Sequence, residues 1–229
     1  MNNEIVFTRE YPYIGKLSAI VTVPSDYKKE EKLPVILFLH GAGERGDSSP
    51  EQLPKVKVHG IPKLFARDND YHGLRVITVS PQCPENTIWD HLTFQLKDFI
   101  DAAVEEFGGD KEKIAITGLS MGGFGTWNMV TTYPDYFRCA APICGGGVPW
   151  RASALKGKKI RCYHSVDDDA VPYECSVLMV RRAKESGADI EFISYTAEGH
   201  GSWVKAYETT DLVEWLAGDR EQKTENRKQ

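Results

Sequence analysis

The sequence lacks any apolar run long enough to cross a membrane, and it lacks any concentration of basic residues. No apolar stretch approaches the roughly 18–20 residues that a membrane-spanning helix needs. The 229 residues carry a formal net charge of −5, with acidic and basic residues interspersed throughout. Binding to nucleic acid usually requires a concentrated basic face. We therefore expect no partnership with a membrane or with nucleic acid.

Paired cysteine motifs are also missing. The five cysteines form no CxxC motif and no Cys/His spacing typical of zinc sites, so neither a metal nor another cofactor is expected. An odd number of cysteines among apolar neighbours suits buried, reduced thiols. Residues 1–10 lack the basic start and apolar run of a secretory signal, which predicts a cytoplasmic protein. A signal peptide removed beforehand would leave the same sequence.

The composition is that of an ordinary globular chain, with 41% hydrophobic and 27% charged residues. The length suits one well-packed domain, which we place at residues 1–218. Residues 219–229 contain no apolar side chain to bury and are expected to form a polar tail. The oligomeric state is not determined by the sequence, so a homo-oligomer stays open.

Short apolar runs of strand length recur along the chain. They are apolar on both faces, which suits central strands of a parallel sheet covered on both sides. These runs are Val35–Leu39, Arg75–Val79, Lys113–Thr117, Lys159–Tyr163 and Ile190–Tyr195. Two earlier segments, Ile5–Phe7 and Leu17–Val23, alternate more between apolar and polar residues. They predict an antiparallel hairpin at the edge of the sheet.

Amphipathic helices are expected between the later strands. The segment Leu92–Phe107 places apolar side chains near a spacing of 3.6 residues and ends at a Gly-Gly pair, a common helix stop. Tyr173–Ser186 and Ser202–Leu216 follow the same pattern. Alternating strands and helices predict a three-layer α/β domain, in which ligands bind at the carboxyl ends of the strands. Chemistry is therefore expected directly after the apolar runs.

A glycine-rich segment around Ser120 follows one of these runs and precedes a predicted helix, Phe124–Thr132. It matches the G-x-S-x-G pattern of a nucleophile elbow, in which the serine lies on a sharp turn between a strand and a helix. The turn leaves no room for side chains beside the serine, and Gly118 and Gly122 meet that requirement. The helix N-terminus favours developing negative charge. Ser120 is therefore the candidate nucleophile.

A second turn of the H-G-x-G type, Leu39–Gly43, follows the most apolar run. Such a turn can aim a backbone N–H group at the carbonyl oxygen of a substrate. We expect Ala42 to be one oxyanion donor and Met121, next to the nucleophile, to be the other. Hydrolases with this elbow place the catalytic histidine after the nucleophile, so His40 is interpreted as structural. The remaining histidines without a partner pattern are also interpreted as structural: His59, His72 and His91.

An acid and a histidine follow the last two apolar runs. The segment His164–Pro172 contains three consecutive aspartates. Asp168 fits a D-x-x-V-P spacing and is preferred as the acid, with Asp167 and Asp169 as alternatives. His200 stands between two glycines, which free its loop to reach the nucleophile. The acid would orient the imidazole and stabilise its charged form, completing a Ser-His-Asp triad.

Together these motifs resemble the small bacterial carboxylesterases of the α/β-hydrolase superfamily, which border phospholipase/carboxylesterases, feruloyl and acetyl-xylan esterases and predicted peptidases. The resemblance runs from about Leu33 to Trp215 and rests on Leu39–Gly46, Pro81–Pro84 with Trp89, Gly118–Trp127, Tyr133-Pro134 and Pro142–Gly147. It implies the α/β-hydrolase fold: a mostly parallel eight-stranded sheet with helices on both faces. It also implies metal-independent ester hydrolysis. The short segment Gly145–Lys158 indicates that no large cap domain is present, and Ser165 departs from the glycine of many relatives.

We therefore expect a serine carboxylesterase that forms a covalent acyl-enzyme on short-chain or carbohydrate-linked esters, including acetyl and feruloyl esters. Trp89 and Trp203 are candidate pocket residues, because aromatic side chains at a pocket mouth can stack on a sugar or a phenolic ring. Ordinary packing is the alternative for both. A serine peptidase or thioesterase on the same scaffold stays open, as does a non-catalytic binding protein.

Overall fold

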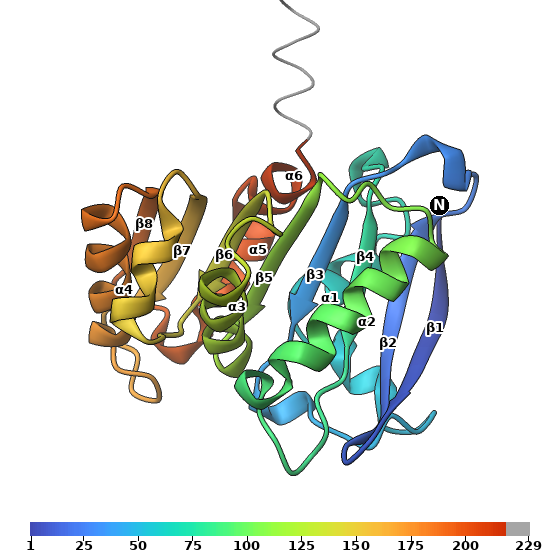
Figure 1. Cartoon of the computed structure of the whole chain (residues 1–229), viewed down its shortest axis with the longest axis horizontal. Helices are drawn as coiled ribbons and strands as arrows, with labels where there is room; N and C mark the ends of the chain where they lie inside the picture. The colour runs from blue at the N-terminus through green and yellow to red at the C-terminus, as the bar shows by residue number, and fades with distance from the viewer. Residues whose placement is uncertain (219–229) are drawn as a thin grey trace, which may run out of the picture.

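One eight-stranded sheet organises the chain, with the strand order β1-β2-β4-β3-β5-β6-β7-β8 (Figure 1). The computed structural model describes residues 1–218, so the predicted tail at 219–229 lies outside the described residues. The strands are β1 (Asn2–Tyr11), β2 (Gly15–Pro24), β3 (Val35–Leu39), β4 (Ile77–Pro81), β5 (Ile114–Leu119), β6 (Cys139–Ile143), β7 (Lys159–Ser165) and β8 (Asp189–Tyr195).

The edge of the sheet is antiparallel and the rest is parallel. β1 pairs with β2 as the predicted antiparallel hairpin, and β2 is also antiparallel to β4. The remaining neighbouring strands, from β4 to β8, pair in parallel. The expectation of a mostly parallel eight-stranded sheet is confirmed. The parallel part brings the carboxyl ends of β3, β5, β7 and β8 to one end of the molecule.

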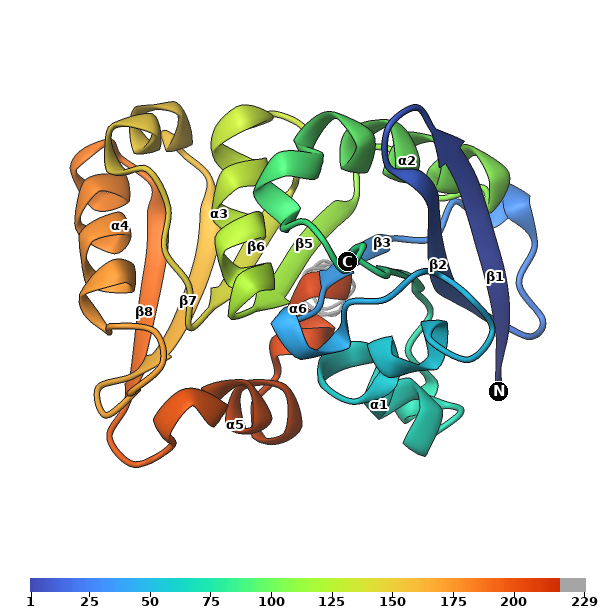
Figure 2. The same ribbon diagram turned by 90° about the horizontal axis from the view of Figure 1, so that it is seen from below.

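Helices cover both faces of this sheet, as Figure 2 shows. One layer contains α2 (Thr93–Glu106), α3 (Met121–Thr132) and α4 (Glu174–Glu185), and the other contains α1 (Gly60–Arg67), α5 (Ser202–Thr209) and α6 (Leu212–Ala217). Along β3 the side chains alternate between the two layers. Leu37 packs in the first core and Phe38 in the second, both fully buried. This explains why the run is apolar at every position.

The expected helix Ser202–Leu216 is in fact two helices, α5 and α6. The break falls at Thr210, whose backbone is extended, with φ −116° and ψ 175°. Its hydroxyl donates to the Ala206 carbonyl oxygen at 2.6 Å and accepts the Leu212 N–H group at 3.2 Å. A short polar side chain that satisfies backbone groups locally competes with a continuous helix, and here it ends one helix and starts the next.

Two elements were absent from the sequence prediction, and one strand was displaced. β6 and α1 were not anticipated, and β4 begins at Ile77 rather than at Arg75. β6 contains small residues and a proline, which give a weak strand signal. α1 spans only eight residues and begins at Gly60, which has a φ of +64°. Short elements of this kind leave little periodicity to read in a sequence.

The expected absence of a large cap is consistent with the connection between β6 and β7. The segment 144–158 contains only the short 3₁₀ helix η6 (Pro149–Leu155). Among residues 1–218, no helix is both long enough and apolar enough to span a bilayer.

Candidate active site

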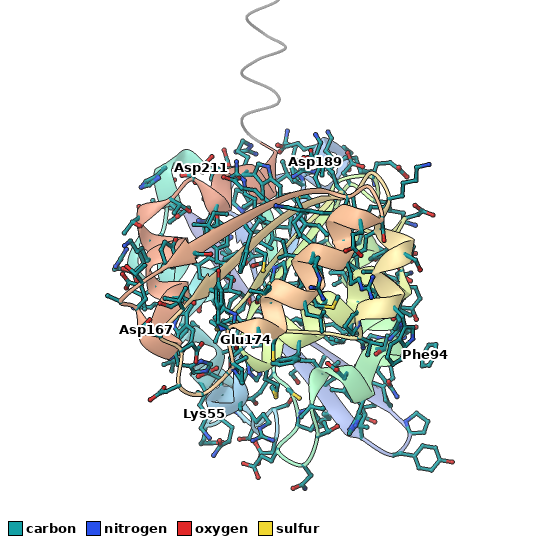
Figure 3. The ribbon with its side chains drawn as sticks, turned by 90° about the vertical axis from the view of Figure 1, so that its left-hand side faces the viewer. Lys55, Phe94, Asp167, Glu174, Asp189 and Asp211 are labelled. Carbon is teal, nitrogen blue, oxygen red and sulfur yellow. The ribbon has the colours of Figure 1, made fainter. Side chains whose placement is uncertain are left out.

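The candidate residues gather where the parallel strands end. Figure 3 shows Asp167, just beyond β7, well below Asp189, the first residue of β8, which lies at the top of the view. Lys55, in the 3₁₀ helix η3 (Leu53–Lys57), lies at the same end as Asp167. This is the edge at which open α/β sheets bind ligands.

Ser120 stands on the strained turn between β5 and α3. Its backbone has φ 71° and ψ −111°, a conformation that side-chain-bearing residues rarely adopt. A Cβ atom at Gly118 would lie 2.4 Å from the Gly122 carbonyl oxygen, and one at Gly122 would lie 1.9 Å from the Leu39 carbonyl oxygen. Any side chain at these two positions would collide with backbone. The local geometry is therefore that of a nucleophile elbow.

The three predicted triad residues lie in one hydrogen-bonded line. Ser120 Oγ is 2.9 Å from His200 Nε2, and His200 Nδ1 is 2.9 Å from Asp168 Oδ2 and 3.0 Å from Oδ1. A carboxylate accepts, so Nδ1 carries a proton and Nε2 is free to accept the serine proton. His200 is held by the short helix η7 (Gly199–Gly201), which follows β8. The arrangement places a base against the candidate nucleophile and an acid behind the base.

Backbone groups support the Asp168 carboxylate. Its Oδ1 atom accepts N–H groups from Ala170 at 3.0 Å and Val171 at 2.9 Å, and the side chain is fully buried. Burial alone would raise the pKa of Asp168. The hydrogen bonds from Val171, His200 and Ala170 outweigh it and hold the pKa below its ordinary value. Asp168 is therefore ionised at neutral pH.

The two neighbouring aspartates have different surroundings. Asp167 accepts the Ser165 hydroxyl and the Gly199 N–H group, the latter at 3.1 Å. Ser165 Oγ also accepts the Glu198 N–H group at 3.2 Å. Asp167 and Ser165 therefore tie the loop after β7 to the loop that carries the histidine. Asp169 is exposed. Of the three aspartates, Asp168 is the one that contacts the candidate base.

A second histidine, His164, contacts the same carboxylate and was given no role from the sequence. It is fully buried, and its Nε2 atom lies 3.1 Å from both Asp168 Oδ2 and the Val171 carbonyl oxygen. Both are acceptors, so Nε2 carries the proton and donates. Nδ1 is 2.8 Å from Ser176 Oγ. Burial lowers the pKa of His164, although Asp168 opposes the shift. Asp168 thus accepts from two imidazole rings, and only His200 reaches Ser120.

The two expected oxyanion donors lie at adjacent strand ends. Leu39 pairs with Gly118 across β3 and β5, which places the turn after β3 beside the nucleophile elbow. Ala42 begins the 3₁₀ helix η2 (Ala42–Glu44), and Met121 begins α3. The first N–H groups of a helix have no acceptor within it, and the dipole of α3 adds positive potential there. The two turns therefore lie side by side at the carboxyl ends of β3 and β5.

His40 holds the turn after β3 in place through hydrogen bonds to backbone groups. It is fully buried, and its Nδ1 donates to the Gly41 carbonyl oxygen at 2.6 Å. Nε2 accepts the Cys83 N–H group at 2.9 Å, so the ring is neutral. Burial lowers the pKa of His40 to about 4. The ring therefore stays neutral at ordinary pH, and the structure places His40 in the structural role that its position in the sequence suggested.

The two tryptophans proposed for a pocket lie in different environments. Trp89 is 0% exposed, and its indole N–H group donates to the His40 carbonyl oxygen at 2.9 Å. With no accessible surface it cannot stack on a substrate, so packing is the correct interpretation. Trp203 is partly buried, and its ring centroid is 5.2 Å from that of His200, at 88°. His59, interpreted as an isolated structural residue, lies 5.3 Å from the Trp203 ring.

One group of side chains in the described part of the chain has the donor types of a metal site. The ligand-type atoms of Cys144, Asp168 and His200 lie within 4.8 Å of one another. Within this group the Asp168 carboxylate and His200 Nδ1 are joined by hydrogen bonds. Cys144 is buried, and burial raises the pKa of its thiol. The thiol is therefore a neutral packing group beside the triad.

Comparison with known proteins identifies the family. Residues 15–171 match the model of the Esterase family, described as "Putative esterase". The chain belongs to this esterase family. The carboxylesterase SOBER1 of Arabidopsis thaliana is 31% identical over 205 residues, covering 74% of this chain and 89% of that protein. A solved structure of a thermostable esterase is 31% identical, with a TM-score of 0.81, and the alignment covers 93% of this chain and 62% of that one.

More distant structures show the same fold. The feruloyl esterase module of Clostridium thermocellum, solved as a mutant in complex with sinapinate, has a TM-score of 0.71 at 16% identity. That alignment covers 91% of this chain and 87% of the other. The chain spans only 23% and 16% of the length of two other curated relatives that it matches. The α/β-hydrolase fold expected from the sequence is confirmed.

Proposed function

We propose that this chain is a serine carboxylesterase with Ser120 as nucleophile, His200 as general base and acid, and Asp168 as the residue that orients the histidine. The observation that carries the proposal is the continuous line from Ser120 Oγ through His200 to the buried Asp168 carboxylate, with 2.9 Å at each step. Membership of the esterase family and the strained elbow support the same conclusion.

The first half of the reaction follows from this geometry. Ser120 Oγ attacks the ester carbonyl carbon while its proton moves to His200 Nε2. The charged imidazolium is stabilised by Asp168, which is already ionised. The N–H groups of Ala42 and Met121 stabilise the oxyanion of the tetrahedral intermediate. When that intermediate collapses, His200 returns the proton to the departing alkoxide oxygen, leaving an acyl group on Ser120.

The second half repeats the same steps with water. His200 Nε2 takes a proton from the attacking water, and the oxygen bonds to the acyl carbon. Collapse of the second intermediate expels Ser120 Oγ, which recovers its proton from His200. The products are a carboxylic acid and the free enzyme, so the cycle balances without a metal or a redox partner.

Short-chain or carbohydrate-linked esters are the substrates that we propose. The connection after β6 is short, and among the described residues nothing forms a large lid over the strand ends. An open site suits small or exposed esters better than long lipids, which need an extended apolar tunnel. The fold shared with a feruloyl esterase is compatible with esters of hydroxycinnamic acids, but it does not select them.

Hydrolysis of p-nitrophenyl acetate and butyrate tests the proposal, with Ser120→Ala as the variant. We expect the substitution to lower kcat by about 10⁴-fold or more, as removal of a triad nucleophile does in other serine hydrolases. A fluorophosphonate probe should label Ser120 in the wild-type protein and leave the variant unlabelled. Undiminished turnover in the Ser120→Ala variant would contradict the assignment.

The same assay separates the alternatives left open by the sequence. Aminoacyl anilides report peptidase activity, and acyl thioesters report thioesterase activity. We expect oxygen esters to be hydrolysed with the highest kcat/KM. Absence of both turnover and probe labelling would instead favour a non-catalytic binding protein on a hydrolase scaffold.

A further inference from the structure

The carboxylate of Glu44 is buried beside the oxyanion turn without a hydrogen-bond partner for its Oε2 atom among the described residues. Glu44 ends η2 and is 7% exposed. Oε2 lies 3.8 Å from His40 Nδ1, which already donates to Gly41. Oε1 lies 3.9 Å from His59 Nε2. Both distances exceed those of a hydrogen bond. The enclosed Oε2 atom faces His40, whereas Oε1 is the oxygen on the side of His59 and has no hydrogen bond within residues 1–218. A largely buried carboxylate without a donor is costly, so Oε1 is the atom to which a ligand can supply one.

Glu44 stands at one end of a wall that leads to His200. The His59 ring packs edge to face on Trp203, and Trp203 packs the same way on His200. His59 immediately precedes α1, and Trp203 belongs to α5. This wall, formed by Glu44, His59 and Trp203, therefore joins the oxyanion turn to the general base.

Two ion pairs hold the two helices of this wall together. Lys63 Nζ and Arg67 Nη1 of α1 lie 3.0 and 3.1 Å from the carboxylate oxygens of Glu208 in α5. The two helices also lie side by side in Figure 2. His59 and Trp203 are thus placed by regular secondary structure and by contacts between helices, which makes the wall a preformed surface.

The position of the wall selects one half of the substrate. His200 Nε2 must deliver a proton to the departing alkoxide, so the alcohol oxygen lies within hydrogen-bond distance of that atom. Because Trp203 packs on the His200 ring, the wall is assigned to the alcohol half of the ester. The separation of 3.9 Å between Glu44 Oε1 and His59 Nε2 is one that a single hydroxyl oxygen spans, with a hydrogen bond of about 2.8 Å to each.

We propose that Glu44 and His59, backed by Trp203, form a binding subsite for a hydroxyl group on the alcohol portion of the ester. The chemical class is a polyol or sugar esterified at one hydroxyl and free at a neighbouring one. The free hydroxyl donates to the Glu44 carboxylate and contacts His59 Nε2, while the Trp203 ring supplies apolar contact. This inference rests on the proposed function, because it assigns the alcohol side from the role of His200.

Partitioning of the acyl-enzyme between two alcohols tests the subsite. With p-nitrophenyl acetate as donor, added glycerol or 1-propanol attacks the acyl-enzyme in place of water. The new ester forms as the bond to Ser120 Oγ breaks, and the alcohol proton passes through His200 to the serine. We expect glycerol to be preferred over 1-propanol by about tenfold or more in the wild-type protein, the range of a charge-assisted hydrogen bond. Gas chromatography of the two acetate esters measures the ratio.

Three variants make the test specific. Glu44→Gln and His59→Phe should each lower the preference for glycerol by about fivefold or more, because the first replaces a charge-assisted hydrogen bond with a neutral one and the second removes the ring nitrogen. Glu51→Gln, an exposed glutamate in the same segment, should leave the ratio unchanged. Both alcohols compete for one acyl-enzyme, so a partly misfolded variant still reports the ratio.

The outcomes separate the subsite from the activity itself. Turnover of p-nitrophenyl acetate with no preference for glycerol, or a preference that survives both Glu44→Gln and His59→Phe, would overturn the subsite and leave the esterase proposal intact. Absence of turnover together with absence of fluorophosphonate labelling would overturn the proposed function, and the subsite with it.

Discussion

Acidification should destabilise this protein through one buried side chain, His40. The ring is 0% exposed, donates from Nδ1 to Gly41 and accepts the Cys83 N–H group at Nε2. A second proton would break the bond from Cys83 and place a charge in the core. Burial accordingly lowers the pKa of His40 from 6.5 to about 4. The unfolded chain therefore binds more protons than the folded one between these two values.

The size of the effect follows from the two pKa values. Because the folded-state pKa is the lower one, the contribution to stability is present above about pH 6.5 and is lost as the pH falls toward 4. Relative to pH 7, the free energy of unfolding should drop by about 2 kcal/mol at pH 5 and about 3 kcal/mol at pH 4 from this residue alone. That is a large fraction of the stability of a typical domain.

Urea unfolding followed by tryptophan fluorescence measures this loss, with His40→Gln as the comparison. The variant should be less stable than wild type at neutral pH, because Gly41 and Cys83 lose their buried partner. The difference between the two proteins should shrink by about 2 kcal/mol between pH 7 and pH 5. The other histidines are common to both and cancel. A difference that stays constant with pH would refute the reasoning.

Three further changes test other contacts of the site. His164→Leu should lower kcat by about tenfold or more with little change in KM, because the Asp168 carboxylate loses one hydrogen-bond donor. His164→Gln can still donate to that carboxylate and should retain most of the activity. Steady-state kinetics normalised by active-site titration check this, and equal losses in both variants would contradict it. Ser165→Gly removes the link between two catalytic loops and should lower Tm by about 2–4 °C in calorimetry; an unchanged Tm would contradict the link. Trp89→Phe removes the buried indole N–H group that donates to His40, so it should lower the free energy of unfolding in urea by about 1–3 kcal/mol without altering the preference between acetate and butyrate esters. A changed preference would show that Trp89 lines the substrate pocket.

The sequence was most informative where one residue type alone satisfies a local constraint. At Gly118 and Gly122 any side chain would meet backbone, and Ser120 adopts a φ of 71° that marks the elbow. The run Val35–Leu39 is buried at every position, and its prediction as a strand was confirmed without a shift. Such constraints act between near neighbours or within one strand, so they can be predicted from the amino-acid sequence alone.

What the sequence did not reveal depends on contacts between distant segments. His59 lies far from His200 along the chain, and only the packing of α1 on α5 brings both to the Trp203 ring. Trp89 gave the same sequence signal whether it lined a pocket or filled the core. Its burial follows from the close approach of Gly125, where a Cβ atom would lie 2.6 Å from that of Trp89. No local pattern contains that information.

The three consecutive aspartates show how the fold separates residues that look alike in the sequence. The Val166 N–H group donates to the Tyr195 carbonyl oxygen at 2.9 Å, which extends the pairing of β7 with β8 past the end of the strand. The chain then turns at Asp168, so this carboxylate faces inward and meets both histidines, while Asp167 reaches across to the histidine loop. The turn after β7 thus presents three neighbouring carboxylates in three directions, and Asp169 stays exposed. The aspartate that contacts His200 is therefore selected by the turn after β7, in which the Ala170 and Val171 N–H groups hold the Asp168 carboxylate against the imidazole.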